Sequence, residues 1–296
     1  MVPKEKHMET QSRSSLFKTE KDASEYLAEY AEFLKAWPIK PDAVEIETDL
    51  GITHLNCVGL ARNPPVLLLP GSSANSLTWF SNIESLSKFN RVLAVDPPGH
   101  PGLSIARGVL NETTVNPWLL QLLAKLSIQK VRLVGWSLGG WAALNFAIKH
   151  PERTERIALL DPGASFVPYN KELLWRTLTS MVLPNQKKLV AYFKWMLQGN
   201  VISQQYGHLT VSGILRTRPQ PLIRMRPFSD EQLRACNIPA LLLIPEKTVL
   251  YKVQDVVGRV SRLMPSTKIE IVPGASHVLH IDRPEAVNSS LKAFLQ

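Results

Sequence analysis

The residues best suited to do chemistry lie in Gly135-Trp136-Ser137-Leu138-Gly139, which fits the pattern G-x-S-x-G. Residues 131–134 predict a short buried strand before this motif, and residues 140–150 predict a helix after it. Strand, sharp turn and helix form the context in which the pattern presents a nucleophilic serine. The glycines leave room for backbone at the turn, and the start of the helix offers an N–H to an oxyanion. The sequence therefore predicts Ser137 as a nucleophile; the alternative is an incidental turn of small residues.

A serine is a weak nucleophile at neutral pH and needs a base to accept its proton. In a parallel sheet that base comes from a loop at the carboxyl ends of the strands. Among the seven histidines, His277 lies on such a loop, after a predicted strand at 268–272. His100 also follows a predicted strand, but on a loop that precedes the serine, and we interpret His280 as structural. We therefore predict His277 as the general base, against the alternative of a hydrogen-bonded loop histidine.

The composition is that of a globular protein, with 296 residues, 45% hydrophobic residues and a net charge of +9. The length allows one large domain or two small ones. The 34 basic residues are spread along the chain, which favours a solvated basic surface over a nucleic-acid or membrane-surface protein. That alternative predicts strongly salt-dependent binding to polyanions. We expect no nucleic-acid partner.

Cofactor and targeting signals are missing from the sequence. Cys57 and Cys236 have no metal-ligand or redox spacing, and neither a phosphate loop nor a dinucleotide fingerprint occurs. We therefore expect no metal and no cofactor. Residues 1–15 lack the apolar stretch of a signal peptide, and no apolar run is long enough to span a bilayer. These features predict a cytoplasmic protein without stable membrane insertion.

The order of the predicted elements indicates an α/β fold. A disordered tail at 1–17 and an amphipathic helix within 18–42 precede two strands, 43–48 and 52–58, that form a hairpin. Strands and helices then alternate, which predicts a mostly parallel sheet with an antiparallel hairpin at its start. After the sixth predicted strand the alternation of strands and helices stops. We predict a helical cap at 163–229, inserted into a core formed by 43–162 and 230–296.

Four segments support a family resemblance: Leu69-Pro70-Gly71-Ser72-Ser73, Asp96 to Gly102, the serine motif, and Gly274-Ala275-Ser276-His277. Over about residues 43–296 the chain resembles the α/β-hydrolase family, and within it the bacterial carboxylesterase-type members. The resemblance implies that Ser137 is the nucleophile and His277 the general base and acid. It also implies an oxyanion hole formed by the N–H of Leu138 and that of Ser72, with Ser73 as a weaker alternative.

The sequence departs from the family pattern at two places. The third strand runs into Pro70-Gly71 rather than His-Gly, so the loop lacks the hydrogen bonds of that histidine. Thr248 also stands where the acid that orients the catalytic histidine is expected, and threonine cannot stabilise an imidazolium as a carboxylate does. Asp161, in a Leu-Asp-Pro context used by some lipases of the superfamily, is the first candidate acid, and Glu246 follows. Asp255 is expected on a helix surface, and the absence of any acid is a further possibility.

Together these features predict a serine hydrolase that cleaves a small, partly apolar carboxylic ester through an acyl-enzyme. A thioesterase, lactonase, amidase or carbon–carbon bond hydrolase stays possible, because one serine and one oxyanion hole serve all of them. The absence of an acid at Thr248 favours a non-catalytic or weakly active binding protein as the alternative. The basic run 216–226 is interpreted as a solvated loop, with an anionic-substrate or partner site as its alternative. The sequence leaves the oligomeric state open.

Overall fold

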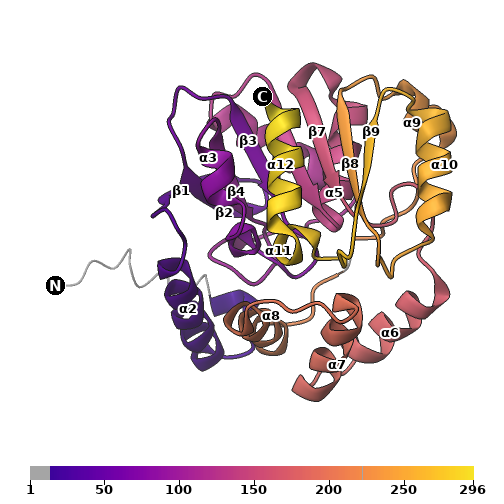
Figure 1. Cartoon of the computed structure of the whole chain (residues 1–296). Coiled ribbons are helices and arrows are strands. Elements are labelled where there is room, and N and C mark those ends of the chain that lie inside the picture. The colour runs from indigo at the N-terminus through magenta and orange to yellow at the C-terminus, as the bar shows by residue number, and fades with distance from the viewer. Residues whose placement is uncertain (1–13, 222) are drawn as a thin grey trace.

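The computed structural model describes residues 14–221 and 223–296, and its centre is a nine-stranded sheet (Figure 1). The strand order is β1-β2-β4-β3-β6-β7-β8-β9, and the short β5 pairs with β2. The strands are β1 (Asp42–Thr48), β2 (Gly51–Val58), β3 (Pro65–Leu69), β4 (Arg91–Asp96), β5 (Ile105–Ala106), β6 (Val131–Trp136), β7 (Thr154–Leu160), β8 (Ala240–Pro245) and β9 (Lys268–Val272).

The sheet is antiparallel at its N-terminal end and parallel elsewhere. β1 and β2 form the predicted hairpin, in which Thr48 pairs with Gly51. The φ of Gly51 is +111°, a conformation that suits glycine. β2 also runs antiparallel to β4, and the remaining neighbours from β4 to β9 are parallel. The predicted α/β fold is confirmed. Because parallel strands end at one edge of the sheet, the loops after β3, β6, β7, β8 and β9 meet there.

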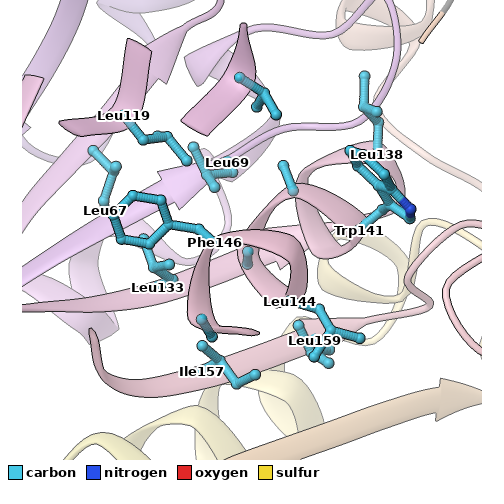
Figure 2. Close-up of a cluster of buried hydrophobic side chains, with 14 of the residues drawn as sticks. Leu67, Leu69, Leu119, Leu133, Leu138, Trp141, Leu144, Phe146, Ile157 and Leu159 are labelled. Atoms are coloured by element: carbon cyan, nitrogen blue, oxygen red, sulfur yellow. The ribbon is translucent and has the colours of Figure 1, made fainter. Parts of the chain in front are cut away.

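Helices cover both faces of the sheet, and successive strand residues alternate between two hydrophobic clusters. One face packs against α4 (Val115–Lys125), α5 (Leu138–Lys149), α9 (Asp230–Ala235) and α10 (Val253–Leu263). The other packs against α3 (Ile83–Ser87), α11 (Leu279–Asp282) and α12 (Pro284–Leu295). Figure 2 shows the first cluster, where Leu133 of β6 lies near Phe146 of α5. The helix that begins at the serine motif is therefore fixed to the sheet by a continuous apolar layer.

The segment predicted as a cap contains α6 (Lys171–Met181), α7 (Gln186–Leu197) and α8 (Gln204–Arg216). In Figure 1 these helices form a layer below the sheet together with α2 (Glu20–Lys35). α2 begins where the side chain of Thr19 accepts a hydrogen bond from the N–H of Asp22. Its residues Tyr26, Tyr30 and Phe33 are buried at helical spacing, which gives α2 one apolar face.

Part of the predicted disordered tail is ordered. Ser14–Leu16 form a 3₁₀-helix, Phe17 forms a β-bridge with Thr217, and the side chains of Leu16 and Phe17 are buried. The sequence could not show this, because the partner of Phe17 lies 200 residues away, at the end of α8. The rest of the predicted tail, residues 1–13, lies outside the described residues.

Candidate active site

Ser137 lies at the turn between β6 and α5, with a φ of +53° and a ψ of −114°. This backbone conformation is rare for a residue with a side chain and is typical of strained functional positions. A Cβ added to Gly135 would lie 2.2 Å from the carbonyl oxygen of Gly139. One added to Gly139 would lie 2.0 Å from the carbonyl oxygen of Leu69. Both motif positions therefore require glycine, as the steric reading of the sequence predicted.

His277 lies on the loop between β9 and α11, and its side chain is buried. The indole N–H of Trp136, the residue before the serine, donates a 2.7 Å hydrogen bond to the His277 carbonyl. The two rings also lie 5.2 Å apart between centroids. The structure thus brings the loop of His277 against the serine turn. Among the described residues no hydrogen bond joins the Ser137 hydroxyl to the His277 ring; such bonds are often long before substrate binds.

Asp161 follows β7 and its side chain is fully buried. Its Oδ2 lies 2.7 Å from Nδ1 of His277. An ionised carboxylate only accepts hydrogen bonds, so Nδ1 donates its proton and Nε2 is left as the basic nitrogen. Two hydroxyls also donate to this carboxylate: that of Thr248 at 2.9 Å from Oδ2, and that of Tyr251 to Oδ1. Three donors therefore surround one buried carboxylate.

Among the described residues Thr248, at the usual acid position, is hydrogen-bonded through its hydroxyl to Asp161 and not to His277. Its hydroxyl supports a carboxylate that comes from the end of the neighbouring strand, since β7 and β8 are paired and parallel. Glu246 is exposed, and its Oε2 accepts a 2.7 Å hydrogen bond from the N–H of Gly274. The structure brings Asp161 and not Glu246 to His277. Asp255 is exposed on α10, as expected.

Tyr251 is a site residue that the sequence reasoning missed. Burial, with the nearby charge of Asp161, raises the pKa of Tyr251 well above its usual value, so the phenol stays protonated as a donor. The loop 245–251 was recognised as the place of the usual acid, but nothing in its sequence indicates a tyrosine that points to the preceding strand. Only the pairing of β7 with β8 brings the two residues together.

Of the predicted oxyanion donors, Leu138 directly follows Ser137, and Ser72 lines the same cavity as Leu138. Within the described residues the N–H groups of Ser72 and Leu138 donate no hydrogen bond, so both are available to a ligand. Gly71, which the family pattern shares, is sterically required, because a Cβ there would lie 2.8 Å from the ring of Trp136. Ser73 has a φ of +57°, which turns the chain directly after Ser72.

A cavity of about 480 Å³ opens onto these donors. Ser72 and Leu138 lie in its wall, and the cap segment adds a mostly apolar set of side chains: Met181, Val182, Leu183, Pro184, Ile214 and Ile223. His100 also lines the cavity and its Nδ1 lies 3.1 Å from the carbonyl of Ala74. Burial lowers the pKa of His100, which keeps its ring neutral. The wall of the cavity is therefore mostly apolar around Ser72 and Leu138, with the cations Lys18 and Arg218 also in its lining.

His280 lies behind the site and has the structural role expected of it. Its ring is fully buried between Trp79 and Trp136, with centroids 4.9 and 4.7 Å away. Tyr206 donates to the Thr78 hydroxyl, which in turn lies 2.9 Å from Nε2 of His280. Burial, together with the nearby His277, lowers the pKa of His280 to about 3. A neutral His280 therefore packs close to His277.

Other chemistry finds little support in the described part of the chain. No group of three or more His, Cys, Asp or Glu residues there could hold a metal ion. Cys57 and Cys236 are free and buried, and burial raises the pKa of Cys57 to about 11, which makes it a poor nucleophile. None of the described helices is long and apolar enough to cross a membrane.

The model of the alpha/beta hydrolase family matches residues 66–290. The chain belongs to this family. It is 31% identical to the uncharacterized carboxylesterase nap of Bacillus subtilis over 277 residues, 91% of either chain, and 28% identical to carboxylesterase YbfK of that organism over 90% of this chain and 92% of the relative. The crystal structure of naproxen esterase from B. subtilis has a TM-score of 0.86 at 30% identity, covering 93% of this chain and 98% of its own. The predicted bacterial carboxylesterase type, a carboxylic-ester hydrolase, is confirmed.

Proposed function

We propose that the protein is a serine esterase that cleaves small, partly apolar carboxylic esters through an acyl-enzyme. The observation that supports this best is the buried Asp161–His277 pair beside the strained turn of Ser137. The similarity to the naproxen esterase and to carboxylesterase YbfK of B. subtilis supports an ester as the substrate.

In the proposed mechanism, Nε2 of His277 takes the proton of Ser137 as its oxygen attacks the ester carbonyl. The N–H groups of Leu138 and Ser72 donate to the resulting oxyanion; the loss of one such donor typically costs about 10²–10³-fold in rate. Asp161 stabilises the imidazolium that forms. His277 then gives the proton to the leaving alcohol, and a water molecule activated by the same ring releases the acyl group.

The case for a non-catalytic binding protein depended on Thr248. That argument loses its basis, because a carboxylate from the preceding strand contacts His277 and Thr248 donates to it. Both motif glycines are also sterically required for the serine turn. Thioesters, lactones and amides present the same carbonyl to the same donors, so a choice among them depends on the substrate and not on the catalytic residues.

The test is pre-steady-state hydrolysis of 4-nitrophenyl acetate and 4-nitrophenyl butyrate. We expect a burst of nitrophenol close to one equivalent of enzyme. Ser137→Ala should abolish this burst and lower the steady-state turnover rate at least about 10³-fold. Ser261→Ala on the exposed surface of α10 is the matched control and should behave as the parent. Retention of the burst by Ser137→Ala would show that another residue is the nucleophile.

A further inference from the structure

The net charge of the protein is concentrated in the cap segment. Residues 163–229 contain nine Lys or Arg residues and one acidic residue, Glu172, so this segment carries a formal charge of +8 out of the chain's +9. The basic residues are spread along the chain, but the acidic residues are not. Electrostatic attraction to an anionic partner is therefore strongest at the cap.

The charges of α6 and α7 are mostly free to act on a partner. Glu172 is paired with Arg176 on the same helix. Lys171, Lys187 and Lys194 are exposed and form no ion pair with another described residue. In contrast, Arg216 at the end of α8 pairs with acidic side chains of α2. Part of the unpaired positive charge of the cap thus lies on its two outer helices, which project at the edge of the molecule in Figure 1.

An apolar surface accompanies this charge. The exposed side chains are Leu174 (54%), Trp175 (66%), Leu178 (56%), Val182 (64%) and Leu183 (74%), which we call the apolar face of α6. Their spacing places them along one side of α6 and its continuation, while Leu173 on the other side is buried. Six of the eleven large hydrophobic side chains that are exposed in the described residues lie between 174 and 190. An exposed apolar patch of this kind indicates an interaction surface.

The apolar face continues into the substrate cavity. Val182 and Leu183 belong to both, and Met181 and Pro184 beside them also line the cavity that reaches Ser72. A partner that covers this face therefore lies at the entrance to the site.

We propose that α6 and α7 dock on an anionic lipid surface. The apolar face of α6 enters the boundary between headgroups and acyl chains, while Lys187, Lys188 and Lys194 lie against the lipid phosphates. The substrate cavity then opens toward apolar esters dissolved in that layer; this last step depends on the proposed esterase function, whereas docking does not.

A lipid surface fits this face better than a second copy of the chain. A symmetric dimer through the face would bring two segments of charge +8 together, and their repulsion would oppose it. Anionic lipid complements both features at once, because it offers negative charge outside and hydrocarbon beneath.

The test is cosedimentation of the full chain with phosphatidylcholine vesicles, with and without phosphatidylglycerol. We expect binding that requires phosphatidylglycerol and weakens at high salt. Leu178→Ser should weaken the partition at least about tenfold, because it removes apolar surface from the lipid. Leu60→Ser is the matched control, because the exposed fraction of Leu60 (55%) is almost the same as that of Leu178 but Leu60 lies outside the cap. It should bind as the parent.

Charge is tested separately. Reversal of Lys187 and Lys188 to Glu should weaken binding at least about tenfold, whereas reversal of the exposed Lys125 and Lys130 should change it less than about threefold. Ser137→Ala should bind as the parent, which separates docking from catalysis. Three results would overturn the proposal: no binding to phosphatidylglycerol vesicles, equal effects of Leu178→Ser and Leu60→Ser, or a dimer that Leu178→Ser dissociates.

Discussion

Replacement of Asp161 by asparagine tests the part of the site that the sequence left open. The carboxylate is fully buried and accepts hydrogen bonds from His277, Thr248 and Tyr251. Asparagine has the same shape, so its amide oxygen can take the place of Oδ2 and still accept from His277 and Thr248. Its NH₂ group then faces the Tyr251 hydroxyl, which can rotate and accept. The fold should therefore tolerate the change, and the protein loses a charge rather than a contact.

The size of the effect follows from the charge. A neutral amide cannot stabilise the imidazolium that forms on His277 during the reaction, and the 2.7 Å contact is the one carboxylate contact of that ring among the described residues. The same substitution in a Ser-His-Asp triad lowers kcat by about 10⁴, where the histidine also takes the wrong tautomer, so this figure is an upper bound for the loss of charge alone. We therefore expect a loss of about 10³–10⁴-fold in kcat, which corresponds to about 4–5.5 kcal/mol of transition-state stabilisation.

The assay is steady-state hydrolysis of 4-nitrophenyl butyrate, with urea unfolding to verify that Asp161→Asn is folded. Glu246→Gln is the matched control. Its carboxylate is exposed and bonds the N–H of Gly274, a contact that an amide oxygen preserves, so we expect less than about a threefold change.

Two results would refute the reasoning. One is a folded Asp161→Asn that keeps more than about a tenth of the parental kcat. The other is a large loss in Glu246→Gln, because it would mean that the loop after β8 supplies the acid in spite of the observed contacts. A further check is Asp161→Asn combined with Thr248→Asp, which returns a carboxylate to the family's usual position and should recover activity over Asp161→Asn alone.

Three further predictions concern the surroundings of the triad. Thr248→Val removes a donor to Asp161 and should lower kcat about tenfold in the nitrophenyl assay with little change in KM. Gly139→Ala forces a Cβ onto the Leu69 carbonyl and should cost more than about 3 kcal/mol of unfolding free energy in urea. The pKa of His280 is about 3 when folded and 6.5 when free, so the unfolded chain binds its proton first as the pH falls. Below about pH 6.5 this lowers the free energy of unfolding by up to about 1.4 kcal/mol per pH unit. When the free energy of unfolding in urea is plotted against pH, His280→Gln should show a shallower slope than the parent.

Much of the fold is predictable from the sequence because its signals are local. Buried strands that alternate with amphipathic helices predict a parallel sheet, and the hairpin at its start has its own loop signal at Gly51. Ser137 can be recognised from its flanking glycines, because the turn itself leaves no room for a side chain at Gly135 or Gly139. The prediction of disorder was wrong for residues 14–17, because the β-bridge of Phe17 to Thr217 orders this segment through a distant partner.

The sequence by itself therefore determined the class of fold, the position of Ser137 and the loop of His277. The tertiary structure decided which carboxylate meets His277, because a contact between Asp161 and a ring 116 residues later depends on the pairing of β7 with β8 and on loop paths that no local pattern encodes. It also decided which apolar residues of α6 are exposed. Helical spacing predicts two faces of a helix, but only packing determines which face the core covers.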